Sequence, residues 1–275
     1  MRYSYYAIVR ADGDGMHRVV ENLADDEAIR RFSHTCLKYC AAIAALVAQY
    51  DGITIYSSGD DLLAILPCES FSGKNLMDFS QEATELYDRF FGEYTPRTTL
   101  SLGIAVTYFR RHLQESIARA SELLFTVAKR GEKNQLAWHI MPYSAMVGID
   151  VECCFVCQKA MIGNLVSLME ITRSLGDKMR NIYGLMPGRL CEKAAMFNGA
   201  DEEQLRNLFK NEFAFLEKVC DAPVVELFTD IFRKIKESGE PRALEGTTEQ
   251  DNPALAMAHL LRLCRFLIGK AGDAE

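Results

Sequence analysis

The sequence predicts an α+β protein with two domains, a sheet layered with helices followed by a small helical domain. Its length of 275 residues suits one large or two ordinary domains, each with a core of its own. Through about Met141, short β-rich runs alternate with amphipathic helical runs in the order β-α-β-β-α-β-α-β. After Gly148 the sequence reads as helix and loop only. The order of the elements favours a mixed or antiparallel sheet.

The first elements follow from apolar runs and their spacing. Tyr5–Val9 is a compact apolar run that predicts a buried strand, followed by a turn at Asp12-Gly13-Asp14-Gly15. From Asp25 to Tyr50 the apolar residues recur at helical spacing. Two strand-like runs, Ile53–Tyr56 and Leu62–Leu66, then flank a Ser-Ser-Gly-Asp-Asp segment and predict a hairpin.

The remaining elements are predicted from the same periodicities. The first domain continues with a helix at Leu76–Phe90, a strand at Thr98–Val106, a helix at Leu113–Val127 and a strand at Leu136–Ile140. In the second domain, helical stripes cover Val156–Ile171, Leu205–Val219, Val224–Ile235 and Leu255–Leu267, with a loop from Glu237 to Asn252. We expect the first domain to span residues 1–147 and the second residues 148–275.

Composition narrows the classes of function. The 31 Lys and Arg residues are outnumbered by 38 Asp and Glu, which gives a net charge of −7 without a basic stripe. This argues against a protein that coats nucleic acid, but not against small phosphorylated ligands. We expect no signal peptide and no membrane span, since no stretch approaches about 18 apolar residues. Nine cysteines in such a chain are expected to be reduced, which favours a cytoplasmic protein.

Two acidic turns carry the most information about chemistry. Asp12 and Asp14 follow the first strand, and Asp60 and Asp61 lie at the tip of the hairpin. Adjacent strands would bring both turns to one edge of the sheet, where the carboxylates repel one another unless a cation neutralises them. Oxygen-rich sites of this kind suit Mg²⁺ or Mn²⁺, and two such ions can activate a hydroxyl and stabilise a leaving pyrophosphate. Each turn taken alone fits ordinary solvated turn residues better than it fits a metal site.

Four segments, in the same order, resemble the palm domain of the large subunits of type III CRISPR systems. They cover about residues 4–140: Tyr6–Met16 resembles that family's first metal-binding strand and turn, Ser57–Ala64 its G-G-D-D hairpin with Ser58 replacing the first glycine, Thr99–Ala105 its T-x-S-x-G-I strand, which is also seen in GGDEF cyclases, and Ala120–Asn134 its A-x-x-L-L-x-x-A-K…K-N helix exit. The resemblance implies a ferredoxin-like palm, RRM-like or GGDEF-like, whose sheet carries helices on one face. The remainder is more weakly similar to the C-terminal helical domain of those subunits.

The resemblance also implies an activity and a set of site residues. Members of the family are nucleotidyltransferases that bind ATP and join adenylates into cyclic messengers, with release of pyrophosphate. By similarity, the metal ligands would be Asp12, Asp60, Asp61 and the carbonyl oxygen of Gly13, with Asp60 and Asp61 also catalytic. The nucleotide-binding residues would be Asp14, Gly15, Ser58, Gly59 and Lys129. For Lys129, an equal alternative is a cation that only offsets the dipole of a helix C-terminus.

Two departures from the family shape the expected function. Ser58 adds a Cβ near the nucleotide, which is tolerable only if its φ is not positive. The chain also contains a single palm and no segment that resembles an HD nuclease. Joining two nucleotides requires two facing sites, so the simplest solution is a homodimer of face-to-face palms. Such a dimer matches the stand-alone minimal CRISPR polymerases (mCpol), which are encoded beside anti-phage effectors that would sense the cyclic nucleotide.

Two other readings remain open at the level of sequence. The chain could be an assembly subunit of a type III CRISPR effector complex that contains a guide RNA, with Ser58 marking partial degeneration. It could also be a degenerate sensor that binds ATP without turning it over. Neither composition nor spacing decides between these readings and a cyclase.

Overall fold

The computed structural model of the protein describes residues 4–130, 133–141, 154–158, 161–175, 177–217, 222–237 and 252–268. The chain folds as two compact units, one of residues 3–152 and the other of residues 1–2 and 153–275. The predicted domain boundary at residues 147 and 148 lies outside the described residues and stays a prediction.

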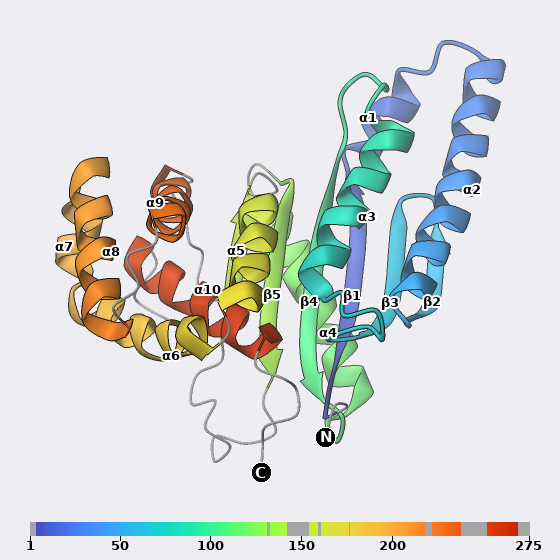
Figure 1. Ribbon diagram of the computed structural model, residues 1–275. Helices are drawn as coiled ribbons and strands as arrows, with labels where there is room; N and C mark the ends of the chain where they lie inside the picture. The colour runs from blue at the N-terminus through green and yellow to red at the C-terminus, as the bar shows by residue number, and fades with distance from the viewer. Residues whose placement is uncertain are drawn as a thin grey trace. The chain divides into compact units, whose positions relative to one another are not determined.

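The first unit contains the strands and helices in the order that the sequence predicts, with one short helix added (Figure 1). They are β1 (Tyr5–Asp14), α1 (Met16–Glu21), α2 (Asp26–Gln49), β2 (Ile53–Ser58), β3 (Asp61–Pro67), α3 (Leu76–Phe91), β4 (Thr99–Tyr108), α4 (Leu113–Glu122), η1 (Leu123–Ala128), which is a π-helix, and β5 (Gln135–Met141). The helix α1 is the added element. At the start of α2, the Asp25 side chain accepts a hydrogen bond from the backbone N–H of Ala28 (2.7 Å), which caps the helix as the sequence boundary implied.

The strands of this unit form a mixed sheet in the order β2-β3-β1-β4-β5. The central strand β1 is antiparallel to both β3 and β4, β2 is antiparallel to β3, and β4 and β5 run parallel. This arrangement confirms the predicted α+β palm fold and its mixed sheet.

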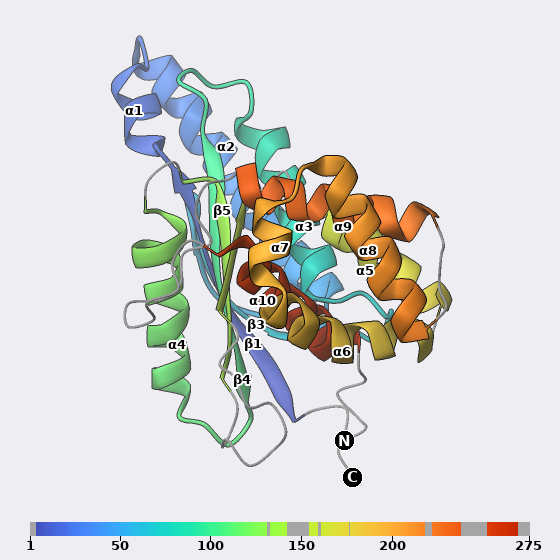
Figure 2. The same cartoon turned by 90° about the vertical axis from the view of Figure 1, so that its left-hand side faces the viewer.

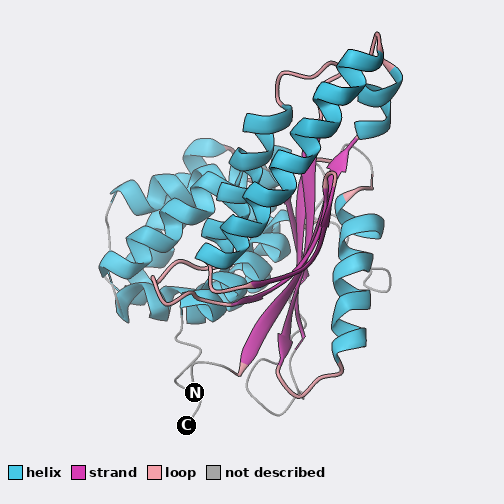
Figure 3. Cartoon of the chain, turned by 90° about the vertical axis from the view of Figure 1, so that its right-hand side faces the viewer, coloured by secondary structure: helices cyan, strands magenta, loops and turns pink. Residues whose placement is uncertain are grey.

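Helices cover both faces of the sheet, which corrects the expectation that they lie on one face. Figures 2 and 3 show α4 on one side of the strands and α2 and α3 on the other. The cause is visible in β4, whose residues from Leu100 to Thr107 are all buried, so both of its faces need apolar cover. On one face, a Cβ at Gly103 would lie 2.5 Å from the Ala120 carbonyl oxygen and from the Leu124 nitrogen. The glycine therefore allows α4 and η1 to pack directly on the strand.

The first strand is longer than the sequence predicts. Asp12, Gly13 and Asp14 are the last residues of β1 and pair with residues of β4, rather than forming a turn beyond the strand. The turn starts at Gly15, whose φ of 77° lies in the left-handed region. The long partner strand β4 supplies the hydrogen bonds that keep this polar segment extended. The first acidic cluster therefore stands on a rigid strand end.

The second unit is mainly helical. It contains β6 (Cys154–Gln158), α5 (Ile162–Leu175), α6 (Asp177–Glu192), α7 (Ala194–Gly199), α8 (Glu202–Glu217), α9 (Ala222–Glu237) and α10 (Pro253–Ile268). The expectation of helix and loop alone is wrong at β6, because a run as short as Cys-Phe-Val-Cys fits either period. The helices α6 and α7 were not predicted. The predicted loop from Glu237 to Asn252 falls largely outside the described residues.

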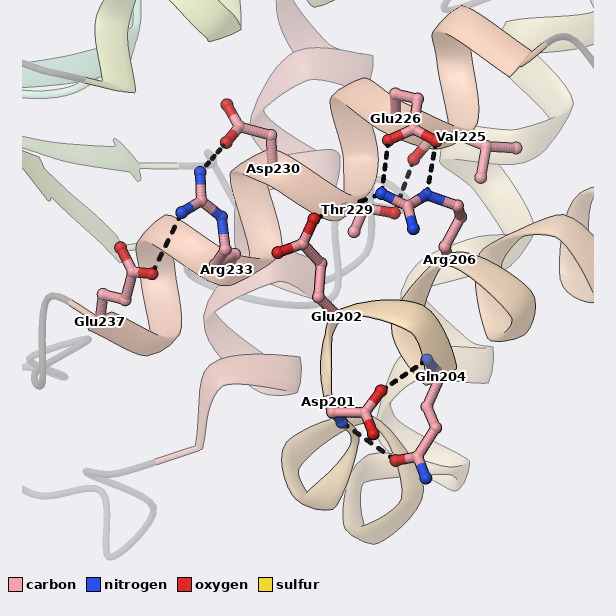
Figure 4. A network of polar contacts seen from close by, with 10 residues as sticks. All are labelled: Asp201, Glu202, Gln204, Arg206, Val225, Glu226, Thr229, Asp230, Arg233 and Glu237. Carbon is pink, nitrogen blue, oxygen red and sulfur yellow. Dashed lines mark hydrogen bonds and ion pairs between the residues drawn. The ribbon is translucent and has the colours of Figure 1, made fainter.

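An aromatic core and a polar surface network hold the helices of the second unit together. Five fully buried phenylalanines pack against one another: Phe197, Phe209, Phe213, Phe228 and Phe232. On the surface, Arg206 of α8 binds Glu226 of α9 through two hydrogen bonds of 2.5 and 3.1 Å (Figure 4). Because exposed ion pairs contribute little, the buried phenylalanines stabilise this unit more than the surface network does. No helix within the described residues is long and apolar enough to span a membrane.

Candidate active site

The end of β1 carries two carboxylates with different surroundings. Asp14 is buried, and its Oδ2 accepts hydrogen bonds from Thr99 Oγ1 (2.8 Å), Ser101 Oγ (2.7 Å) and the backbone N–H of Asn134 (3.0 Å). Thr99 lies opposite Asp14 in the β1–β4 register and Ser101 lies opposite Asp12, so the T-x-S spacing delivers both hydroxyls to one carboxylate. Asp14 therefore fixes the local structure and leaves Asp12 as the more accessible carboxylate.

Lys129 faces Asp12 across the sheet edge. Its ammonium group contacts Asp12 Oδ2, donates a hydrogen bond to the carbonyl oxygen of Gly13 (2.9 Å) and lies 3.4 Å from Asp14 Oδ1. The lysine directly follows η1, and its backbone N–H bonds to the carbonyl of Leu124, five residues earlier. This wide turn, of a kind often found at functional sites, brings the side chain onto the carboxylates.

Asp60 approaches Gly13 from the other face of the sheet. A Cβ at Gly13 would lie 2.5 Å from Asp60 Oδ2 and 2.4 Å from the hydroxyl of Tyr87, so only glycine fits there. Burial raises the pKa of Asp60 to about 6, and the neighbouring carboxylate of Asp12 adds to this rise, whereas Lys129 opposes it. A carboxyl group with such a pKa gains from a nearby cation.

Asp61 has a partner of its own. Arg10 of β1 donates a hydrogen bond to Asp61 Oδ1 at 3.3 Å, and its guanidinium lies 5.6 Å from the centre of the Phe125 ring. Burial raises the pKa of Asp61, and the charge of Arg10 opposes this rise. The two adjacent aspartates of the hairpin are therefore neutralised in different ways.

The hairpin tip retains the conformation that its glycine permits. Gly59 has a φ of 64°, and its carbonyl oxygen accepts a hydrogen bond from Cys40 Sγ of α2 (3.6 Å). Ser58 does not have a positive φ, so the condition for a serine at this position is met. Gly15, in the turn after β1, lies under the guanidinium of Arg18, which is 2.7 Å from the place of a Cβ there.

The donors present match a hard divalent cation in chemical type. The Asp12 carboxylate and the Gly13 carbonyl already hold a cation, the Lys129 ammonium, and the Asp60 carboxylate lies beside the same glycine. Carboxylate and carbonyl oxygens are the ligands that Mg²⁺ and Mn²⁺ prefer. Among the described residues, however, no three His, Cys, Asp or Glu side chains are gathered as a metal-binding group. The predicted metal ligands therefore remain a prediction.

Part of the chain matches a known protein family. Residues 5–137 match the model of the Cas10/Cmr2 family, second palm domain. The matched residues make up just under half of the chain. The palm domain aligns with the CRISPR system Cmr subunit Cmr2 of Pyrococcus furiosus, at 26% identity over 152 residues. That alignment covers 46% of this chain and 17% of Cmr2.

Solved structures share the fold over nearly the whole chain. A type III-B Cmr-beta structure in the apo state superposes with a TM-score of 0.63 at 13% identity, covering 98% of this chain and 39% of that one. A Csm1–Csm4 cassette in complex with cA4 gives a TM-score of 0.53 at 13% identity, covering 96% and 36%. At this identity the likeness concerns the fold alone. The chain spans less than two fifths of the length of these relatives.

Sequence reasoning missed two side chains that shape the site. Arg10 gave a signal, since a charged residue directly after the buried run of β1 needs a partner. Tyr87 gave none, because it follows the apolar periodicity of α3 and reads as an ordinary core residue. All nine predicted site residues lie at the β1–β3 end of the palm domain or, for Lys129, directly against it.

Proposed function

We propose that the protein is a metal-dependent nucleotidyl cyclase that makes cyclic adenylates from ATP in anti-phage defence. The palm fold is compatible with a small set of reactions. Among these, the match to the Cas10/Cmr2 second palm domain favours nucleotidyl transfer. Complexes of the structurally similar Csm1–Csm4 cassette with cA4 suggest that the messenger is an adenylate.

The observation that carries the proposal is a cation held at the end of β1. Lys129 binds the Asp12 carboxylate and the Gly13 carbonyl, and Asp60 lies beside that glycine with its pKa raised to about 6. The carboxylates at this edge of the sheet are thus stabilised by a nearby positive charge. A purely structural ion pair would not require a second, half-buried carboxylate beside the same glycine.

Each group has a distinct task in the proposed reaction. Asp12, Asp60 and the Gly13 carbonyl would hold Mg²⁺ or Mn²⁺, which would neutralise the leaving pyrophosphate and favour ionisation of the attacking hydroxyl. Lys129 would neutralise the triphosphate, and the backbone around Gly15 and Gly59 would lie close to its oxygens. Catalysis would come mainly from positioning and from fixed charges.

Incubation of the purified protein with ATP and either metal tests the proposal. We expect release of pyrophosphate and a cyclic adenylate product, identified by mass spectrometry. Asp60→Asn should lower the rate by at least roughly 100-fold, because it removes a charged ligand at unchanged size. Asp51→Asn is the matched control, since Asp51 lies at the opposite end of β2, and it should leave the rate unchanged. Equal product from the Asp60 variant, or none from the wild type, would contradict the proposal.

Joining two nucleotides requires two facing sites, and residues 5–137 supply one of them in this proposal. We infer that two chains pair with their palms face to face, so that two ATP molecules meet, as in a stand-alone minimal CRISPR polymerase. In this setting the product would act on a separate effector that senses cyclic nucleotides, and no guide RNA would be needed.

A second candidate function is that of an assembly subunit in a type III effector complex. The observation that favours it is the fold match to the Cmr-beta structure, which extends over the helical unit as well as the palm. In that case the helical unit would dock other subunits, and the protein would copurify with guide RNA. A homodimer that is active without RNA would contradict this second function.

A further inference from the structure

The hydroxyl of Tyr87 is buried beside the candidate site, with the Thr98 side chain as a neighbour. Tyr87 lies on α3, and its side chain is fully buried. Its ring packs against Tyr39 and Phe91, with centroid distances of 5.5 and 4.8 Å. These ring contacts would be equally available to a phenylalanine. The oxygen makes no hydrogen bond of normal geometry within the described residues, although burying an unpaired hydroxyl is unfavourable.

The same hydroxyl lies close to the carboxylate of Asp60. A Cβ built on Gly13 would lie 2.4 Å from Tyr87 Oη and 2.5 Å from Asp60 Oδ2. Both oxygens therefore approach one point, the space that the missing side chain of Gly13 leaves open. The hydroxyl comes from α3 and the carboxylate from the hairpin tip, so two separate elements converge on this space.

The electrostatic surroundings keep the hydroxyl protonated. Burial raises the pKa of Tyr87, the neighbouring Thr98 side chain opposes this rise, and the carboxylates of Asp60, Asp14 and Asp12 add to it. A protonated phenol among carboxylates can act as a hydrogen-bond donor. Of these three carboxylates, Asp60 is the one that shares the open space beside Gly13 with the hydroxyl.

We propose that Tyr87 is a positioning residue for Asp60, which donates a hydrogen bond to the Asp60 carboxylate and holds it in the orientation that binds the divalent cation. The inference rests on the proposed function, because it assigns Asp60 to the metal. It adds a residue that neither the sequence pattern nor the match to the palm family indicates. Tyr87 itself contacts neither metal nor nucleotide in this scheme.

The Tyr87→Phe variant tests the inference, because it removes the oxygen and keeps the ring. We expect Mn²⁺ binding, measured by electron paramagnetic resonance on the full-length protein, to weaken by roughly tenfold, the usual loss for one hydrogen bond to a charged group. The kcat for pyrophosphate release should fall by a similar factor, while the KM for ATP changes less than about threefold, since Tyr87 does not touch the nucleotide.

Tyr50→Phe is the matched control. The Tyr50 hydroxyl is also buried without a hydrogen bond of normal geometry, but its surroundings are Lys74 and Glu82 rather than the carboxylates of the site. The control should leave Mn²⁺ affinity and kcat unchanged. Mn²⁺ affinity within twofold of wild type in the Tyr87 variant, or an equal loss in both variants, would overturn the inference.

The outcome for the wild type separates this inference from the proposed function. A wild type that binds Mn²⁺ but releases no pyrophosphate would contradict the cyclase proposal, and the positioning role would then stand or fall on Mn²⁺ affinity alone. A wild type that binds no Mn²⁺ would overturn both. Activity in the wild type with no effect of Tyr87→Phe would overturn only the role of Tyr87.

Discussion

Asp12 and Asp14 lie two residues apart on one strand, yet their side chains have different roles. Three hydrogen bonds and its burial commit Asp14 to the local structure. Asp12 keeps 23% of its side chain exposed, and its Oδ2 contacts the ammonium group of Lys129. Because Asp14 is buried and its Oδ2 already accepts these three hydrogen bonds, Asp12 is the better candidate ligand for an incoming cation.

The residue between them gives the first prediction. Gly13→Ala should destabilise the palm domain by about 1–3 kcal/mol, because the new methyl group would overlap Tyr87 Oη and Asp60 Oδ2. Urea denaturation followed by the fluorescence of Trp138, the single tryptophan, measures this. In a Tyr87→Phe background the penalty should shrink, since one of the two clashing atoms is gone. Equal stability of Gly13→Ala and wild type would show that the space beside Gly13 is larger than described.

Among the elements, the α4–η1 segment does the most to position the site. It packs on β4 at Gly103, carries Phe125 to Arg10 and ends where Lys129 meets Asp12. A regular α-helix would rotate the residues after Leu123 by a different amount. The π-helix therefore sets which side chains reach the carboxylates.

A buried histidine couples α4 to β5 and gives a pH-dependent prediction. Arg119 Nε donates a hydrogen bond to His139 Nδ1 at 2.7 Å, which requires a neutral imidazole. Burial and the charges of Arg119 and Arg111 lower the pKa of His139 to about 3. Since the unfolded value is 6.5, the neutral form stabilises the fold above pH 6.5, and this stabilisation is lost as the pH falls toward 3.

The expected size of this effect is about 1.4 kcal/mol per pH unit below 6.5. Between pH 6.5 and 5 the wild type should therefore lose roughly 2 kcal/mol relative to His139→Gln, a variant that keeps an acceptor but does not titrate. The free energy of unfolding, measured through Trp138 at both pH values, gives the difference. Parallel pH profiles of the two proteins would contradict the prediction.

The elements of the palm domain could largely be predicted from sequence, and the reason is local. The helix α2 shows clear helical spacing and a capping aspartate, and the hairpin shows two apolar runs around a Gly-Asp tip. The extent of β1 could not be predicted, because Asp12-Gly13-Asp14 favours a turn until pairing with β4 overrides it. The helix α6 was missed because its apolar pattern is weak and it contains Pro187.

The site could be predicted only in outline. Adjacent strands bring Asp12 and Asp60 to one edge of the sheet, and both acidic segments can be recognised in the sequence. The hydrogen bonds of Asp14, the pairing of Asp61 with Arg10 and the approach of Tyr87 depend on register and on packing across the sheet. Side chains from strands and helices distant in sequence meet there without any pattern along the chain.

At the scale of the whole molecule, the proposed dimer makes a kinetic prediction. If two palms must face each other, the specific activity should rise with protein concentration until the dimer is fully formed. Adding an excess of Asp60→Asn should depress the rate further than dilution would, because mixed dimers contain one impaired site. Sedimentation velocity and initial rates of pyrophosphate release measure both. A monomer with constant specific activity at every concentration would contradict the dimer.

The ion pair between Lys129 and Asp12 has a consequence for the order of events. The Lys129 ammonium binds oxygens that a divalent ion would use as ligands. In the proposed site, the lysine and the metal ion would therefore compete for the same oxygens. A metal ion that binds there would displace the Lys129 ammonium, which could then bind the triphosphate. Binding of the metal ion and release of Lys129 for the triphosphate would then be one coupled step. A nucleotide that arrives without a metal ion would find Lys129 still bound to Asp12.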